Sequence, residues 1–149
     1  MSGYATDVGV RWSDQDAYGH VNHARVVTLL EEARAALLFD AAVRDGVAAF
    51  EAGLLVAALD VRYRMPIPWS TGGVRVEMVV DELRAASFRV RYRLLVADPD
   101  GAWDTRKPAA EASTQLVPYD LGTARPRRLT ADERAFLAAY ESDESDEGR

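Results

Sequence analysis

Residues 12–38 read WSDQDAYGHVNHARVVTLLEEARAALL and decide the fold, because a polar loop here leads directly into a helical pattern. Apolar residues recur at helical spacing in it, at Val26, Val27, Leu30, Ala33, Leu37 and Leu38. The pattern predicts a helix that begins at about Asn22 and runs to at least Phe39, with a second helical segment over 40–50 that extends or follows it. Alanines widen its apolar stripe, as is typical of a helix that other structure partly surrounds. We therefore expect a long central helix.

The spacing of apolar residues changes to two after Gly53, which predicts half-buried strands. Four such segments follow one another, over 59–65, 74–80, 88–96 and 110–116. A short strand over 4–12 precedes the polar loop. One-sided alternation with short connections is typical of an antiparallel sheet. A strand, a long helix and four strands therefore predict one sheet that curls over one helix.

The C-terminal part of the sequence predicts a short helix and an acidic tail. Thr130 followed by Glu133 fits a capping box that opens a helix through about Tyr140. Residues 141–149, ESDESDEGR, contain no apolar side chain, so we expect them to be disordered. A chain of 149 residues with 48% hydrophobic residues can bury one sizeable core. We therefore expect one domain over residues 1–140 and a tail over 141–149.

Composition excludes several classes of function. The formal net charge of -6 argues against nucleic acid as a partner, because phosphate backbones require a basic surface. The absence of cysteine excludes disulfides, thiolate metal sites and a cysteine nucleophile. No stretch approaches the roughly 20 apolar residues that cross a bilayer, and no leader-like segment opens the sequence, so we expect a cytoplasmic protein without a membrane partner. Lys107 is the sole lysine, and codon bias or phosphate binding would both explain the preference for arginine.

The loop at residues 14–23, DQDAYGHVNH, gathers side chains that carry chemistry. It holds two carboxylates and both histidines of the chain, directly before the predicted helix. A helix N-terminus offers unpaired backbone N–H groups and positive partial charge, which suit an oxyanion. Asp16 is the first candidate for an attacking or proton-accepting group, although an aspartate that only caps the loop would stand in the same place. Asn22 fits the N-cap of the helix.

The order of the elements, this loop and the helix residues Glu31, Ala33 and Arg34 resemble the hotdog-fold acyl-CoA thioesterases of the 4-hydroxybenzoyl-CoA thioesterase type. The resemblance extends over nearly the whole chain up to Tyr119. It implies an α+β hotdog fold, in which an antiparallel sheet of five or six strands wraps around a long central helix. It also implies an acyl-CoA substrate and a homodimer or homotetramer with active sites at the subunit interface.

The same resemblance implies roles for individual residues. Asp16 matches the catalytic carboxylate, which acts on the thioester as nucleophile or general base, and backbone N–H groups around His23 polarise the thioester carbonyl. Residues 63–66 resemble the strand end that precedes a turn in the family. The expected catalytic residues are Asp16, Asn22 and His23, and the expected substrate-binding residues are Tyr18, Gly19, His20, Val21 and Tyr63.

Two departures from the family pattern bear on the substrate. Val26 and Leu30 stand where members often carry tyrosines, which predicts an acyl pocket that is more aliphatic than aromatic. Residues 68–73, PWSTGG, replace a Gly-Asp turn that is frequent in the family. Glu31 and Arg34 lie three apart on one helical face, where we expect an ion pair rather than catalysis.

Several alternatives remain open for the residues of the loop. Asp14 is either a second acid or a solvated loop carboxylate. His23 either orients Asp16 or a water molecule, or is only a first-turn residue. An enoyl-CoA hydratase would use Asp16 with His20, and a noncatalytic acyl-CoA or acyl-carrier binding protein would use the same fold. Two histidines three residues apart, without a third well-spaced ligand, do not favour a metal site, so we expect no metal and no cofactor.

Overall fold

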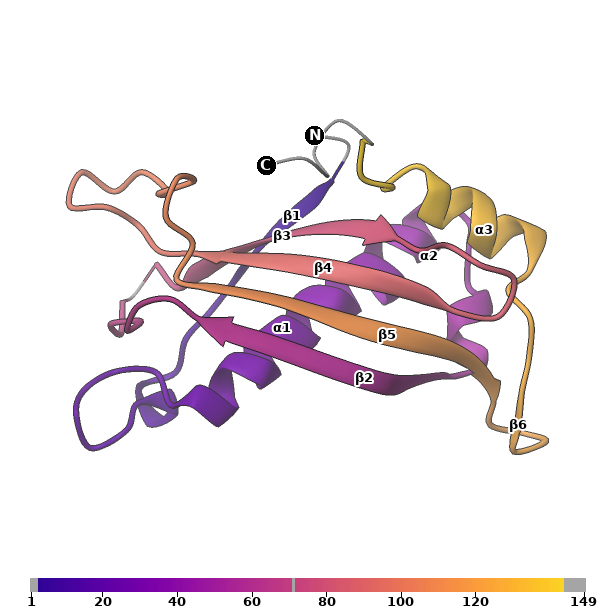
Figure 1. The fold of residues 1–149 in the computed structure, drawn as a ribbon, viewed down its shortest axis with the longest axis horizontal. Helices are drawn as coiled ribbons and strands as arrows, with labels where there is room; N and C mark the ends of the chain where they lie inside the picture. Colours follow the sequence, from indigo (N-terminus) through magenta and orange to yellow (C-terminus); the bar gives the residue numbers. More distant parts are fainter. Residues whose placement is uncertain (1–2, 71, 144–149) are drawn as a thin grey trace.

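The computed structural model describes residues 3–70 and 72–143 (Figure 1). In chain order the elements are β1 (Tyr4–Val8), a 3-10 turn (Trp12–Asp14), α1 (His23–Ala35), a π-helical segment (Ala36–Ala41), α2 (Ala42–Arg44), a second 3-10 turn (Ala49–Ala52), β2 (Leu54–Tyr63), β3 (Val74–Asp81), β4 (Phe88–Leu95), β5 (Ala110–Asp120), β6 (Arg125–Pro126) and α3 (Ala131–Ala138).

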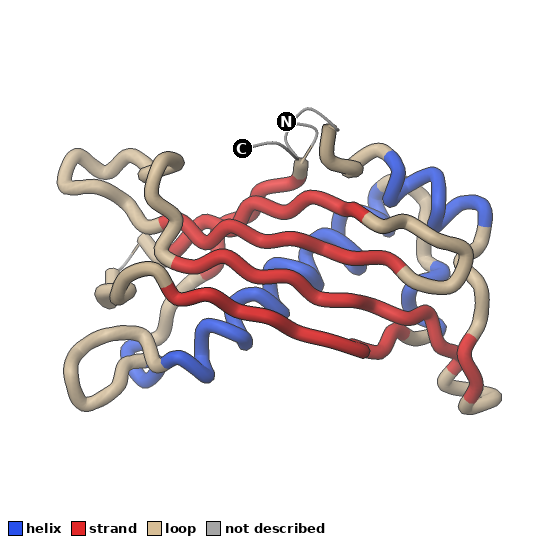
Figure 2. Tube along the Cα trace, in the orientation of Figure 1, coloured by secondary structure: helices blue, strands red, loops and turns tan. Residues whose placement is uncertain are grey.

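Strands β1 to β5 form one antiparallel sheet in the order β1-β3-β4-β5-β2, and β6 pairs with the end of β5. The two edges of the sheet are therefore β1 and β2. Figure 2 shows these strands side by side, with the long helix crossing behind them. The predicted α+β architecture, an antiparallel sheet of five or six strands around a central helix, is confirmed.

The long helix is continuous from His23 to Arg44, because α1, the π-helical segment and α2 follow one another without a break. Asn22 caps it as predicted, and the Asn22 side chain accepts a hydrogen bond of 2.8 Å from the Ala24 N–H. Gly46, with φ at 83°, supplies the left-handed conformation that ends the helix. The core side chains of the helix are Val26, Leu29, Leu30, Ala33, Leu37, Leu38, Ala41 and Ala42.

Alternating burial on the strands explains why the sheet covers this helix. On β3, Val76 and Val80 are fully buried, whereas Arg75 and Glu77 are only partly buried. β4 alternates in the same way, with three arginines on the outward positions. Each fully buried side chain of this size stabilises the fold by about 1.5–3 kcal/mol relative to an exposed one. The inner face of the sheet therefore forms the core with the helix, and the outer face carries charged residues.

β2 differs from the prediction, because it begins at Leu54 rather than at Leu59. Its first residues, LLVAAL, are apolar without alternation, and its pairing with β5 shifts register between Val56 and Ala58. The start of β2 therefore lacks the alternation of apolar and polar residues from which the other strands were predicted. Four side chains of β2 are between 45% and 49% exposed: Leu55, Val56, Leu59 and Tyr63.

Two other predicted elements are shorter than expected. β1 ends at Val8 rather than at residue 12, and Asp14 closes the turn that follows by accepting a hydrogen bond of 2.8 Å from the Arg11 N–H. The second helical segment expected over 40–50 continues the long helix only to Arg44, because the Gly46 turn interrupts it.

The C-terminal helix α3 begins with the predicted capping box. The Thr130 hydroxyl accepts the Glu133 N–H at 3.1 Å, and the Glu133 carboxylate accepts the Thr130 N–H at 2.8 Å. Beyond α3, the Ser142 N–H donates to the Val80 carbonyl oxygen at 2.9 Å, so the chain here lies beside β3. The remainder of the expected acidic tail, residues 144–149, lies outside the described residues.

Candidate active site

The loop at residues 15–21 is closed on itself and held against the segment that follows β2. Within it, the Asp16 N–H donates a hydrogen bond of 2.8 Å to the His20 carbonyl oxygen. The Val21 N–H donates to the Ile67 carbonyl oxygen, also at 2.8 Å. The loop is therefore fixed in position at the start of α1.

The two carboxylate oxygens of Asp16 differ in their surroundings. Oδ1 accepts hydrogen bonds from the backbone N–H groups of Tyr18, at 2.8 Å, and of His20, at 3.3 Å. Oδ2 accepts no hydrogen bond from any other described residue. The loop thus holds the half-buried carboxylate by one oxygen and leaves the other oxygen available to a substrate.

The first turn of α1 leaves one backbone donor free. The Asn22 side chain accepts the Ala24 N–H, and the Asn22 carbonyl oxygen accepts the N–H groups of Arg25 and Val26. The His23 N–H donates no hydrogen bond within the described part of the chain. A free N–H at a helix N-terminus carries positive partial charge, which suits a carbonyl oxygen that becomes an oxyanion.

Tyr63 connects the end of β2 to this first turn. Its hydroxyl donates a hydrogen bond of 2.8 Å to the His23 carbonyl oxygen, and its ring meets the imidazole edge-on, with centroids 6.4 Å apart. Partial burial raises the pKa of the Tyr63 hydroxyl, so the group stays protonated as a donor at neutral pH.

An open cleft of about 440 Å³ lies beside Asp16. Of the residues expected from the sequence, five line it: Asp16, His20, Val21, His23 and Tyr63. The other three do not: Tyr18 is 85% exposed, Gly19 turns the loop with φ at 78°, and Asn22 caps α1. The lining is completed by Val26, Arg64, Met65, Pro66 and Ile67.

The sequence did not place Met65 or Ile67 in the site, and it marked Arg64 only as one of several strand arginines that either face solvent or meet coenzyme A phosphates. They lie where β2 ends and the chain turns back towards the loop. The prolines on either side of Ile67 were the available signal, because proline cannot continue a strand ladder and leaves the neighbouring carbonyl free to bond elsewhere. The hydrogen bond from the Val21 N–H uses that carbonyl of Ile67.

Asp14 is not the solvated carboxylate that was one expectation from the sequence. It is 3% exposed, and it accepts hydrogen bonds from the Arg11 N–H at 2.8 Å and the Arg11 guanidinium at 3.0 Å. The Asp14 carbonyl oxygen also accepts the Asn22 N–H at 2.8 Å. Burial opposes ionisation, but the hydrogen bonds from Arg11 and the charges of Arg11 and Arg25 hold the pKa of Asp14 below its usual value. Asp14 therefore anchors the loop rather than facing the cleft.

The ion pair expected between Glu31 and Arg34 does not form among the described residues. The Arg34 guanidinium instead donates to the Tyr92 hydroxyl at 3.4 Å, and that hydroxyl shares a hydrogen bond of 2.7 Å with the Thr114 hydroxyl. Tyr92 and Thr114 are buried on the inner face of the sheet. Glu31 remains exposed and does not line the cleft.

Side chains suited to metal binding do not gather in the described ranges, where no three of His, Cys, Asp or Glu come together. The described part of the chain likewise has no helix with the length and apolar character that crossing a membrane requires.

A family model of the thioesterase-like superfamily matches residues 10–138. The chain belongs to this superfamily. No curated protein matches the sequence of this superfamily member.

Solved structures agree with that family. A thioesterase from Thermus thermophilus, complexed with coenzyme A and zinc, is 26% identical with a TM-score of 0.71 over 94% of this chain and 95% of its own. YbaW from Escherichia coli is 25% identical with a TM-score of 0.69 over 93% of this chain and 98% of its own. The chain is also similar in fold to Slr0204, a 1,4-dihydroxy-2-naphthoyl-CoA thioesterase from Synechocystis. The two are 15% identical, with a TM-score of 0.70 over 91% of this chain and 96% of Slr0204.

Proposed function

We propose that this chain is an acyl-CoA thioesterase, which hydrolyses a thioester to a free acid and coenzyme A. One observation carries the proposal: the free Oδ2 of Asp16 and the free N–H of His23 belong to residues that line the same cleft. They supply an attacking or proton-accepting oxygen and an oxyanion donor, which acyl transfer requires. The family, and the coenzyme A bound to the Thermus thermophilus relative, support coenzyme A as the thiol.

Asp16 can complete the reaction by either of two routes. As a nucleophile, Oδ2 bonds to the acyl carbon, the carbon–sulfur bond breaks with its electron pair on sulfur, and water then hydrolyses the acyl-aspartyl anhydride. As a general base, Oδ2 takes a proton from the water that attacks the carbonyl. A thiolate departs without protonation, so neither route needs a second acid. In both routes the His23 N–H stabilises the oxyanion, and one donor of this kind typically changes kcat by about 10²–10³.

The cleft favours an aliphatic acyl group. Its apolar wall is made chiefly of Val21, Val26, Met65 and Ile67. The aromatic ring of Tyr63 is fixed at one side by its hydrogen bond to His23. Of the two helix positions behind the expectation of an aliphatic pocket, Val26 lines the cleft and Leu30 does not.

We also propose that the chain forms a homodimer, or a homotetramer of two dimers, through the free edge of β2. Edge strands usually carry charge or proline, or are short, which prevents them from pairing with other chains. β2 spans 10 residues, and LLVAAL at its start has no charge and no proline. A second copy paired along β2 would bury Leu55, Val56 and Leu59 and would reach the cleft at Tyr63.

A panel of acyl-CoA thioesters, incubated with chelator-treated protein and followed by free thiol release, tests the enzymatic proposal. We expect release from at least one aliphatic acyl-CoA. Absence of release across short, medium, long and aromatic acyl groups would overturn the proposal, and binding without release would indicate a noncatalytic acyl-CoA or acyl-carrier binding protein. Loss of the enoyl absorbance of crotonyl-CoA without thiol release would instead indicate a hydratase.

A further inference from the structure

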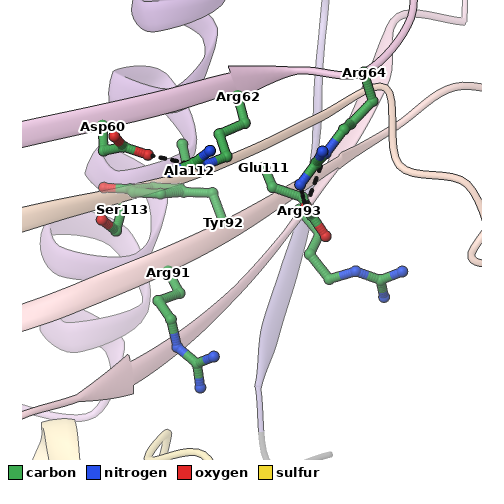
Figure 3. A pocket seen from close by; sticks show the side chains of 9 residues that line it. All are labelled: Asp60, Arg62, Arg64, Arg91, Tyr92, Arg93, Glu111, Ala112 and Ser113. Carbon is green, nitrogen blue, oxygen red and sulfur yellow. Dashed lines mark hydrogen bonds and ion pairs between the residues drawn. The ribbon is translucent and has the colours of Figure 1, made fainter. Parts of the chain in front are cut away.

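Arg64 lies where three hollows of the surface meet. It lines the cleft that contains Asp16. Together with Met65 it also lines a second hollow of about 320 Å³, which Lys107, Pro108 and Glu111 complete. Arg64 and Glu111 then line a third hollow of about 370 Å³ on the outer face of the sheet (Figure 3). A bound molecule can therefore extend from the cleft past Arg64 to the outer face.

Positive charge gathers along this path, although the net charge of the whole chain is -6. Among the residues that line the second and third hollows, the carboxylates are Asp60 and Glu111. The cations are Arg62, Arg64, Arg91, Arg93 and Lys107. The path therefore suits an anionic part of a ligand.

The cations differ in whether they already form ion pairs with carboxylates of the protein. Arg91 and Arg93 pair with Asp81 and Glu77 of β3. Arg64 donates from Nε and Nη2 to a single Glu111 oxygen, at 3.2 and 3.0 Å, and its Nη1 has no partner among the described residues. The Lys107 ammonium makes no ion pair within the same ranges. The second hollow thus holds two cationic groups with free donors, Arg64 Nη1 and Lys107 Nζ.

Lys107 is presented by an anchored loop. The Asp104 carboxylate accepts the backbone N–H groups of Arg106 and Lys107, at 3.1 and 3.2 Å. The Arg93 guanidinium donates to the Thr105 carbonyl oxygen. The sole lysine of the chain is therefore held at the second hollow by an anchored loop, which lowers the entropy lost when it binds an anion.

We propose that the second hollow, between Arg64 and Lys107, binds the phosphate groups of coenzyme A while the thioester lies at Asp16. This rests on the proposed thioesterase function and assigns the residues that recognise the nucleotide end of the substrate. Arg64 supplies an N–H donor and Lys107 a compact charge, the two kinds of group that bind phosphate. Glu111 opposes binding, because it competes with the phosphate for the Arg64 guanidinium and its negative charge repels the phosphate.

Two thioesters of the same aliphatic acid, one of coenzyme A and one of N-acetylcysteamine, test the proposal because the second lacks every phosphate. We expect Lys107→Gln to raise KM for acyl-CoA roughly 5- to 30-fold at low salt, with kcat retained. The preference for acyl-CoA over the truncated thioester should fall by the same factor. Glu111→Gln should lower KM for acyl-CoA. The matched control is Arg106→Gln, which removes a positive charge from the same loop but lines neither hollow, and should change the preference less than twofold.

Calorimetric binding of coenzyme A and of pantetheine, to the parent and to Lys107→Gln, separates this proposal from the proposed activity. Weaker binding of coenzyme A alone supports the phosphate site even if no thioester is hydrolysed. Equal loss with both ligands, an unchanged KM in Lys107→Gln, or a parent that binds pantetheine as tightly as coenzyme A would each overturn it.

Discussion

The hydroxyl of Tyr63 and the carbonyl oxygen of His23 are joined by a hydrogen bond of 2.8 Å, which connects the edge strand β2 to the first turn of α1. The same His23 supplies the free N–H that we propose as the oxyanion donor. The position of this donor therefore depends on the end of a strand whose outer edge is free. An interface formed along β2 would thus be coupled to the chemistry in the cleft.

Replacing Tyr63 tests this coupling. Tyr63→Phe removes the hydroxyl and keeps the ring, so we expect kcat to fall about three- to tenfold and the free energy of unfolding to fall by about 0.5–1.5 kcal/mol, the usual net value of one hydrogen bond. Steady-state kinetics and urea unfolding measure the two effects. Tyr119→Phe is the control, since the Tyr119 hydroxyl makes no hydrogen bond among the described residues. A normal kcat in Tyr63→Phe would exclude a positioning role.

The buried pair of Glu133 and Arg127 predicts a pH dependence of stability. Arg127 donates to both Glu133 oxygens, at 2.7 and 2.9 Å, and Glu133 is fully buried. Burial alone would raise the pKa of Glu133, but hydrogen bonds from Arg127 and Thr130 hold it below the usual value of 4.5. A carboxyl group whose pKa is lower in the folded state contributes stability above its unfolded pKa and loses it as the pH falls through the folded pKa.

We therefore expect Glu133→Gln to be about 3–5 kcal/mol less stable than the parent at pH 7, because it leaves the partly buried Arg127 guanidinium with carbonyl partners but no carboxylate to balance its charge. The difference should begin to shrink as the pH falls below about 4.5, where the carboxyl group takes up a proton in the unfolded chain, and should be lost as the pH falls through the lower pKa of the folded state. Urea unfolding between pH 7 and pH 3 measures both quantities. Glu51→Gln, at an exposed glutamate, should change neither. A difference that stays constant with pH would contradict the ion pair.

The parts of the fold that follow a regular period could be predicted from the sequence. β3 alternates throughout and β4 as far as Leu94, because one face packs on the helix and the other meets solvent. Asn22 and Thr130 cap their helices as expected. The start of β2 could not be predicted, because Leu54 and its neighbours lack a polar side to reveal the strand.

The loop residues of the candidate site could be predicted from the sequence, but the residues that complete the lining of the hollows could not. Asp16, His20 and His23 are close in sequence, so one motif places them together. Arg64 and Lys107 meet only because the end of β2 and the loop before β5 are brought together by strand pairing, which a single sequence does not reveal. The anchoring of Asp14 was hidden for a different reason, since it depends on a local turn in which Arg11 folds back onto the carboxylate three residues later.

The exposed edge of β2 gives a prediction about assembly. Leu59 is 45% exposed on β2, which has no outer neighbour among the described strands. In a monomer, Leu59→Lys should change the free energy of unfolding by no more than about 0.5 kcal/mol. In a dimer paired along β2 it introduces a charge into the interface on both copies, so we expect monomers and a large loss of thioester hydrolysis.

Sedimentation velocity at micromolar concentration measures this change. Phe39→Lys is the control, because Phe39 has a similar exposure of 42% but lies on the long helix. We expect the parent and Phe39→Lys to sediment as the same oligomer. A parent chain that sediments as a monomer would contradict the proposed interface and with it the connection between β2 and the cleft.

Asp16→Asn gives the sharpest test of the chemistry. The asparagine oxygen can still accept the N–H groups of Tyr18 and His20, while an amide replaces the free Oδ2. We expect kcat to fall by roughly 10²–10⁴, or about 3–5 kcal/mol of barrier, with little change in KM or in melting temperature. Thiol release and thermal unfolding measure these, after mass spectrometry has excluded deamidation.

Asp14→Asn is the matched comparison, because it makes the same change two residues earlier in a buried carboxylate that anchors the loop. Asp14→Asn should lower the free energy of unfolding by about 1–3 kcal/mol, because it weakens the hydrogen bonds that Arg11 donates to this side chain. At temperatures where the variant is folded, it should reduce kcat far less than Asp16→Asn does. If Asp16→Asn loses activity only because it melts early, Asp16 is a loop cap. If Asp16→Asn keeps near-parent activity, the catalytic assignment is wrong. A large loss of kcat confined to the Asp16 variant leaves chemistry at its free oxygen as the explanation.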